Sequence, residues 1–271
     1  MASRLAGIRP LVGDLLSAEP WRALSGEPLD AIFHFAAEIP REHHPSYQQL
    51  MTANAGATAA LLDVYDRSQA QVFVYASSLP IIGFPRELPV TENHPALPLT
   101  PYHASKYAGE IAGLEFGRRT RRRVVAFRLT APYGPGMPDS VLPRFLAAAA
   151  GGREISVYGS GSRVQNFVWA DDVARASLAA LRQGDGCFNL GGPSGVSMLE
   201  LAELACDIAG GRRELIRLQA GPDPQEDYRF EVDTSKFAGE FTEVALTDIA
   251  SGLQEFNRFL RSREICRGWW T

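Results

Sequence analysis

The chain has 271 residues, of which 45% are hydrophobic and 21% are charged, and its formal net charge is −4. These values are typical of a globular protein with a substantial core and argue against intrinsic disorder. The acidic balance predicts no nucleic-acid partner. One arginine-rich run, residues 118–123, lies between a predicted helix and a predicted strand, where we interpret it as a solvated connection.

The cysteine pattern and the hydropathy indicate the cellular compartment in which the protein resides. Cys187, Cys206 and Cys266 are odd in number, scattered and without metal-ligand spacing, which favours a reducing environment over a disulfide framework. No apolar run approaches the ~20 residues that a membrane span needs, and the N-terminus lacks the layout of a signal peptide. We therefore predict a cytoplasmic protein with no membrane partner.

Strand and helix signals alternate along the chain. Apolar runs predict strands at residues 8–12 (the weakest), 30–35, 72–75, 124–129 and 187–190. Helical periodicity predicts helices at residues 46–67, 102–118, 142–150, 171–181, 198–209 and 247–259. Residues 79–100 carry five prolines and predict a long functional loop, and residues 132–138 are rich in turn formers.

This alternation predicts an α/β fold, a Rossmann-like doubly wound parallel sheet with a smaller C-terminal substrate lobe. We place the first domain at residues 1–130, with a strand and helix near 165–190 returning to it. Residues 131–271 then form mainly the substrate-binding lobe.

The sharpest chemical signal is a tyrosine and a lysine four residues apart. Tyr102 and Lys106 lie on one face of a predicted helix. A phenol titrates near pH 10, and a neighbouring ammonium lowers its pKa toward the range where it can exchange protons at neutral pH. Only two of the 27 basic residues are lysines, so an accidental match is improbable. We interpret the pair as catalytic.

A pair of hydroxyl side chains ends the strand predicted at residues 72–75. Ser77 and Ser78 stand where open α/β sheets place their ligand-binding groups. Taken alone, they could simply terminate the strand. With the Tyr102–Lys106 pair about 25 residues later, we expect one of them to orient a substrate carbonyl.

The motifs resemble those of the extended short-chain dehydrogenase/reductases, the group that contains NAD-dependent epimerases and dehydratases. The resemblance spans nearly the whole chain, and the segments that carry it are 12–15, 34–37, 54–58, 77–83, 102–106, 128–136, 158–161, 167–173 and 188–191.

The resemblance implies a role for individual residues. Tyr102 would be the acid–base residue, Lys106 would hold the nicotinamide ribose and tune Tyr102, and Ser78 would supply the catalytic hydroxyl, with Ser77 as the fallback on the substrate side. Asn54 would be a residue that supports the site. The residues that would contact the cofactor are Asp14, Ala36 and Ala37.

The sequence lacks the family's pyrophosphate-binding turn. No Gly-x-x-Gly-x-x-Gly occurs, and roughly one βαβ unit (~30 residues) expected before Asp14 is missing. Residues 191–195 look similar but have the wrong spacing. Either the start is misassigned and the native protein is an ordinary NAD- or NADP-dependent dehydrogenase or epimerase, or the sheet has lost its first strand and must repack, dimerise or borrow a partner. We therefore expect NAD or NADP to bind weakly or not at all, and we expect a homodimer.

The substrate signals are also atypical. Family members that act on nucleotide sugars commonly carry Asn at the position of Ala131, and Arg-Asp where this chain has Gln165 and Asn166. Arg163 or Arg144 could compensate, and with Gln165 they are our candidate substrate-binding residues. The histidines show no metal-site spacing, so we predict no metal and interpret them as structural or exposed: His34, His43, His44, His94 and His103.

Three functions remain open at this point. The first is reduction, oxidation or epimerisation at a hydroxyl/carbonyl carbon of a small molecule, either a sugar or a biosynthetic intermediate. The second is a cofactor-independent lyase, isomerase or cyclase that uses the same acid–base set. The third is a non-catalytic relative that serves as a binding partner, and the intact Ser-Tyr-Lys set argues against it.

Overall fold

The computed structural model describes residues 7–17, 28–40, 45–137, 140–221, 223, 225–226 and 228–262. Its centre is a parallel sheet in the order β1-β2-β3-β7. Because the strands are parallel, their C-terminal ends meet at one edge. The strands are β1 (Ala31–His34), β2 (Val72–Ser78), β3 (Arg123–Leu129) and β7 (Gly186–Leu190).

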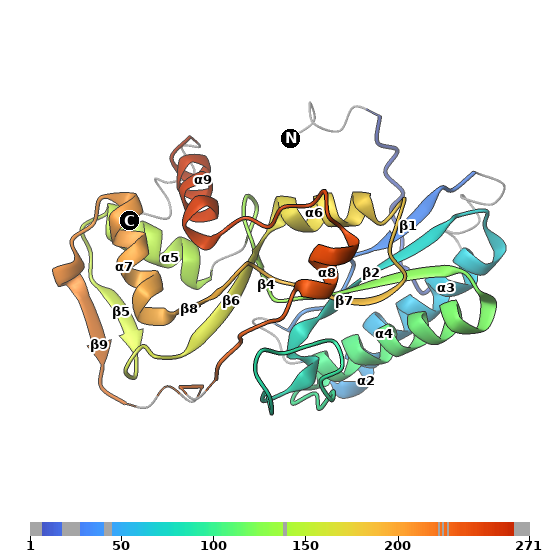
Figure 1. Ribbon diagram of the computed structural model, residues 1–271, viewed down its shortest axis with the longest axis horizontal. Coiled ribbons are helices and arrows are strands. Elements are labelled where there is room, and N and C mark those ends of the chain that lie inside the picture. Colours follow the sequence, from blue (N-terminus) through green and yellow to red (C-terminus); the bar gives the residue numbers. More distant parts are fainter. Residues whose placement is uncertain are drawn as a thin grey trace.

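Helices cover both faces of this sheet (Figure 1). Alternate residues of β2 point to opposite faces: Val72 and Val74 belong to the core beneath one layer of helices, and Phe73 and Tyr75 to the core beneath the other. The first layer contains α6 (Ala170–Ala179) and α8 (Ser235–Glu240), and the second contains α3 (Ala57–Arg67) and α4 (Pro101–Thr120). The predicted doubly wound α/β fold is thus confirmed.

Small residues bring α4 close to the sheet. A Cβ at Gly109 would lie 2.5 Å from the Tyr75 hydroxyl, and one at Gly117 would lie 3.0 Å from Val124. Since no side chain larger than hydrogen fits at Gly109 without movement, glycine fixes the height of α4 above β2. That height places Tyr102 and Lys106 at the edge where the strands end.

A smaller C-terminal region has its own core, built around Tyr133, Trp169 and Phe256. Its strands form the sheet β4-β6-β8 and the parallel pair β5-β9. These strands are β4 (Ala131–Tyr133), β5 (Ile155–Tyr158), β6 (Val164–Trp169), β8 (Gly195–Ser197) and β9 (Ile216–Gln219), and its helices are α5 (Val141–Ala150), α7 (Met198–Ala209) and α9 (Ile249–Ser262). The exact division at residue 130 stays a prediction.

Two local predictions differ from the structure, and a third holds. Residues 8–12 form no strand, and Val12 is 99% exposed, because no described strand pairs with them. The turn predicted at residues 132–138 includes part of β4. The helix predicted at 46–67 begins at Tyr47, after the extended N-cap Ser46, and continues as α2 (Tyr47–Leu50), a π-helical turn (Met51–Gly56) and α3.

The predicted loop at residues 79–100 is largely irregular, after a short 3₁₀ turn (Leu79–Ile82). Gly83 ends that turn at a φ of 70°, and a Cβ there would lie 2.4 Å from the Leu97 carbonyl oxygen. Only glycine tolerates both the left-handed backbone and this approach. The loop therefore returns against its own start, next to Ser78.

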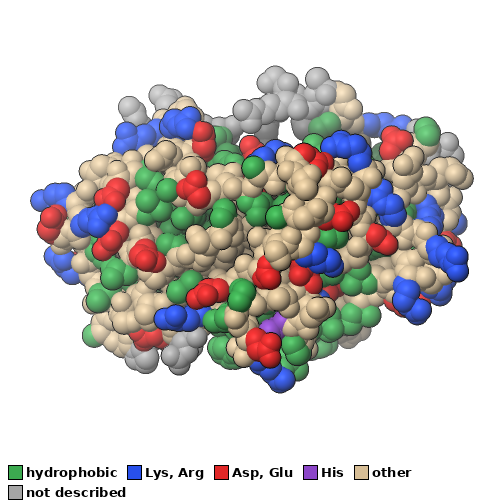
Figure 2. Space-filling model, viewed as in Figure 1, with side chains coloured by type: hydrophobic (Ala, Val, Ile, Leu, Met, Phe, Trp, Pro, Cys, Tyr) green, Lys and Arg blue, Asp and Glu red, His purple; other side chains and the backbone are tan. Residues whose placement is uncertain are grey.

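The face drawn in Figure 2 shows no field of a single charge among the described residues. Acidic and basic side chains are interspersed over the face drawn in Figure 2, which agrees with the modest net charge of −4. Within the described part of the chain, no helix has the length and apolarity required to cross a membrane.

Candidate functional site

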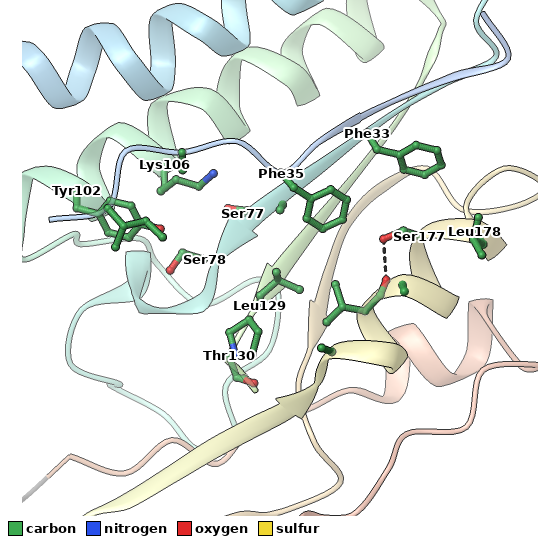
Figure 3. A pocket seen from close by; sticks show the side chains of 17 residues that line it. Phe33, Phe35, Ser77, Ser78, Tyr102, Lys106, Leu129, Thr130, Ser177 and Leu178 are labelled. Carbon is green, nitrogen blue, oxygen red and sulfur yellow. Dashed lines mark hydrogen bonds between the residues drawn. The ribbon is translucent and has the colours of Figure 1, made fainter. Parts of the chain in front are cut away.

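A cavity of about 650 Å³ opens at the edge where β1, β2 and β3 end (Figure 3). Ser78, Tyr102 and Lys106 all line it, so the structure brings together the three residues that the sequence predicts as catalytic. The opposite wall is apolar and includes Phe33 from β1 and Leu178 from α6. A few polar groups in a mostly apolar cavity are the usual composition of a small-molecule site.

The start of α4 fixes the tyrosine and the lysine. Thr100 caps the helix by accepting a hydrogen bond from the backbone N–H of His103, and Pro101 follows as the first helical residue. Lys106 is only 3% exposed, and its ammonium lies 4.3 Å from the centroid of the Tyr75 ring, a favourable cation–π arrangement. The cap thus fixes the helix start that carries Tyr102, and packing holds the Lys106 side chain.

Burial sets the protonation of this pair. It raises the pKa of the Tyr102 phenol above its ordinary value, so the lowering that we expected from Lys106 is not found. Burial also lowers the pKa of Lys106 to about 8, although Glu110 acts in the opposite direction. At neutral pH Tyr102 is thus a protonated acid beside a lysine that is still mainly charged.

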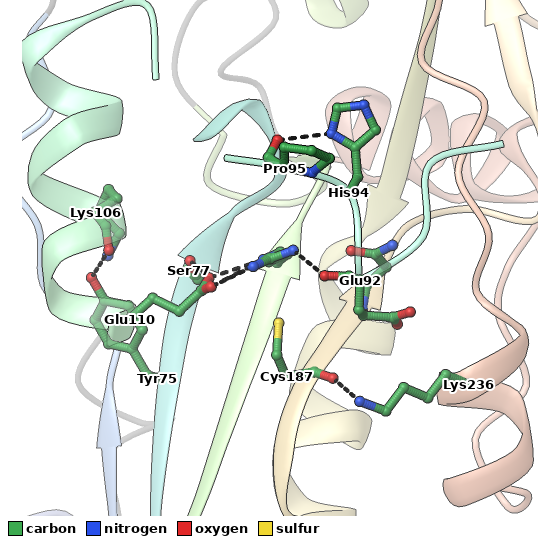
Figure 4. A network of polar contacts seen from close by, with 11 residues as sticks. Tyr75, Ser77, Glu92, His94, Pro95, Lys106, Glu110, Cys187 and Lys236 are labelled. Carbon is green, nitrogen blue, oxygen red and sulfur yellow. Dashed lines mark hydrogen bonds and ion pairs between the residues drawn. The ribbon is translucent and has the colours of Figure 1, made fainter. Parts of the chain in front are cut away.

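The two serines have different environments. The Ser77 hydroxyl donates to a Glu110 carboxylate oxygen at 2.5 Å, and that carboxylate also binds Arg128 through Nε and Nη2 (Figure 4). Ser77 is thus committed to a buried network, although it touches the cavity. No hydrogen bond of the Ser78 side chain is found among the described residues, which favours Ser78 as the substrate-facing hydroxyl.

Removing one partner of this buried ion pair should strongly destabilise the fold. Glu110 and Arg128 are 1% and 7% exposed, so Glu110→Gln leaves the Arg128 guanidinium buried without its counter-charge. We expect a loss of about 3–5 kcal/mol in the free energy of unfolding, measured by urea denaturation. The control is Glu115→Gln on the same helix: its partner Arg119 is exposed, so we expect a change below about 1 kcal/mol. Equal effects of the two changes would contradict this prediction.

Asn54 supports the site from behind rather than from its wall. Its side chain donates to Ser105 Oγ at 2.8 Å, and Ser105 Oγ donates to the Tyr102 carbonyl at 2.7 Å. The same amide exchanges two hydrogen bonds with the Glu38 backbone, just after β1. Asn54 therefore links the segment after β1 to the first turn of α4. That it supports catalysis by positioning this turn remains a prediction.

The expected cofactor contacts are scattered. Ala37 lines the cavity, but Ala36 is exposed and does not. Asp14 is also exposed, and its carboxylate accepts from the Leu16 N–H in a turn away from the cavity wall. Only Ala37 and Lys106 of the predicted set thus face this cavity, and the cofactor roles of Asp14 and Ala36 stay predictions.

The candidate substrate-binding residues also do not lie in one place. Arg163 and Gln165 line a second cavity of about 200 Å³, which shares Thr130 with the first. Arg144 lies exposed on α5 and lines neither cavity. His103, which we interpreted as structural or exposed, also lines the second cavity. Its place directly after Tyr102 was the signal that could have found it.

The other described histidines are buried and bonded within the protein. His34 is buried against Thr58, and burial lowers its pKa to about 4. His94 bonds through both ring nitrogens to backbone groups. No cluster of potential metal ligands occurs among the described residues. Cys187 and Cys206 are free thiols, and His43, His44 and Cys266 lie outside the described residues.

Comparisons with known proteins agree on one family. A model of the NAD dependent epimerase/dehydratase family matches residues 2–191. The dTDP-glucose 4,6-dehydratase of Streptomyces niveus is 32% identical over 247 residues, covering 89% of this chain and 72% of that protein.

Solved structures extend the likeness. The structure of the dTDP-glucose 4,6-dehydratase DesIV of Streptomyces venezuelae, with NAD and TYD bound, has a TM-score of 0.78 at 27% identity and covers 95% of this chain and 80% of that one. RMD of Pseudomonas aeruginosa, complexed with NADPH, has a TM-score of 0.83 at 24% identity over 97% of this chain and 94% of that one, a likeness of fold.

Proposed function

Because the chain belongs to the NAD dependent epimerase/dehydratase family, we propose that it oxidises, reduces or epimerises a hydroxyl/carbonyl carbon of a sugar nucleotide. The observation that carries this proposal is the convergence of Ser78, Tyr102 and Lys106 on one cavity at the end of a parallel sheet. The sugar-nucleotide class is suggested by the relatives, which include dTDP-glucose 4,6-dehydratases.

The three residues have distinct roles in this proposal. In the direction of reduction, Tyr102 Oη gives its proton to the carbonyl oxygen as that oxygen gains negative charge; in oxidation it takes the hydroxyl proton. Ser78 donates a hydrogen bond to the same oxygen and holds it toward Tyr102. The Lys106 ammonium stabilises the phenolate that Tyr102 becomes after it loses its proton.

The site fits one end of the cofactor that the family uses. Lys106, with three ammonium donors on the cavity wall, and Ala37, which leaves space beside β1, would hold the nicotinamide and its ribose. A bound NAD or NADP would supply the hydride carrier for this chemistry. The printed sequence contains no Gly-x-x-Gly-x-x-Gly, so we assign no residue to the pyrophosphate.

The composition of the two cavities favours this chemistry over the elimination of water. Elimination needs one group to protonate the departing hydroxyl and another to remove a proton from carbon. Among the described residues, neither of the two cavities is lined by a carboxylate, and their titratable groups near neutral pH are Lys106 and His103. We therefore propose that the product retains every oxygen of the substrate.

The test is direct incubation with dTDP-glucose and UDP-glucose, each with NAD⁺ or NADP⁺, in D₂O. We expect oxidised or epimerised product by mass spectrometry and NMR, with no loss of water. Titration with NADH and NADPH, followed by fluorescence, measures cofactor binding separately. A product that lacks one water would overturn the proposed reaction class, and no conversion of either sugar nucleotide would overturn the proposed substrate class.

A further inference from the structure

The second cavity adjoins the proposed catalytic cavity through a single residue. Thr130, which follows β3, lines both cavities. Tyr102 lines the first and its neighbour His103 lines the second, and the two rings meet edge-on with centroids 5.4 Å apart. A molecule whose reacting carbon lies at Tyr102 would therefore extend past His103 and Thr130.

Two uncharged buried polar atoms on this wall lack partners. Within the described part of the chain, His103 Nδ1 and Thr130 Oγ1 are shielded from solvent and make no hydrogen bond. Arg163 Nε makes no hydrogen bond either, but it is ion-paired with Asp223. A buried polar group without a partner costs about 1–3 kcal/mol, so such atoms are rare in folded proteins unless a ligand or ion uses them. Two of them on one small cavity are accounted for by a ligand that supplies hydrogen-bonding groups there.

The charge balance of the cavity indicates which groups these are. Arg163 Nε lies 3.2 Å from Asp223 Oδ2, and its Nη1 donates to Gln225 Oε1 at 2.8 Å. This arginine is therefore neutralised within the protein and is a poor candidate for the phosphate fork that we considered from the sequence. Burial lowers the pKa of His103, so its imidazole is neutral at neutral pH. A neutral donor–acceptor wall suits hydroxyl groups better than phosphates.

We propose that His103 and Thr130 form a hydroxyl-recognition subsite, which holds the sugar ring beside Tyr102 and determines which sugar the enzyme accepts. This inference rests on the proposed function, because it takes a sugar nucleotide as the substrate. The neutral imidazole offers one donor and one acceptor, and the threonine hydroxyl offers both. Together they can distinguish the two configurations of a ring hydroxyl.

The experiment separates sugar binding from nucleotide binding. Isothermal calorimetry measures dTDP-glucose and dTDP against the wild type, His103→Ala and Thr130→Val. Each variant should bind dTDP-glucose about five- to tenfold more weakly, the effect of one lost hydrogen bond, and should bind dTDP as the wild type does. Thr120→Val is the matched control. That hydroxyl donates to the Phe116 carbonyl within α4 and lines neither cavity, so both affinities should be unchanged.

The outcomes are distinct. A variant that binds both ligands more weakly by the same factor would show a structural role and would overturn the subsite. A variant that binds dTDP-glucose as tightly as the wild type does would also overturn the subsite. A wild type that binds dTDP-glucose no more tightly than dTDP would also overturn it. Selective loss without any turnover by the wild type would support the subsite and refute only the proposed reaction. Thr130→Val keeps the side-chain shape, so the test stands even where His103→Ala fails to fold.

Discussion

Tyr102→Phe should reduce kcat by about 10³-fold or more, the upper part of the range that a positioned acid–base group contributes. The change removes one oxygen atom, and with it the only proton that we propose moves between protein and substrate. Burial raises the pKa of this phenol, so in the wild type it carries its proton at neutral pH and is ready to donate it in the direction of reduction. The measurement is the initial rate with the sugar nucleotide that the wild type converts.

Two controls make that result specific. The fold should survive, because no hydrogen bond of the Tyr102 hydroxyl is found among the described residues, so the melting temperature of Tyr102→Phe should match that of the wild type. Tyr158→Phe removes the same atom from a side chain that is 68% exposed on β5, and it should leave the rate unchanged. A Tyr102→Phe protein that keeps a tenth of the wild-type rate would remove Tyr102 from the mechanism.

The sequence predicted the parts of the site that local spacing can encode. The separation of Tyr102 and Lys106 predicts one helix face wherever the helix lies, and a strand that ends in Ser77 and Ser78 predicts hydroxyls at a sheet edge. What spacing cannot encode is which serine is already engaged. Glu110, which binds Ser77, lies 33 residues away along the chain and meets it only because Gly109 allows α4 to approach β2.

The second cavity was less predictable because it also depends on contacts between residues that are distant in the sequence. His103 and Thr130 come from different elements, and their common feature, a buried atom without a partner, exists only after the chain has folded. The strands β5, β8 and β9 were missed as separate elements because they are short and partly exposed, and β6 was missed although its last four residues are buried. In such strands tertiary pairing, rather than an apolar run, decides the structure.

The pKa of Tyr102 is the clearest case in which burial overrides a local argument. A lysine four residues away favours the phenolate, and that was the basis of our expectation. In the folded chain both groups lose solvent, which disfavours the charged form of each, so the pKa of the phenol rises and that of the ammonium falls. At neutral pH Tyr102 is therefore a protonated acid and Lys106 is still mainly a cation, so the rate should depend on the charge of the lysine.

Lys106→Arg should lower kcat about 10²-fold or more and should also change the pH profile. The wild-type rate should fall as the pH rises through about 8, because above its pKa the Lys106 ammonium loses the charge that stabilises the Tyr102 phenolate. A guanidinium keeps its charge beyond pH 12, so the variant should be slow but without that decline. The chain's other lysine provides the control. Lys236 is exposed and donates to the Cys187 carbonyl, so Lys236→Arg should keep both the rate and the decline near pH 8. A Lys106→Arg protein with the wild-type rate and the wild-type pH profile would show that Lys106 is only a buried cation packed against Tyr75.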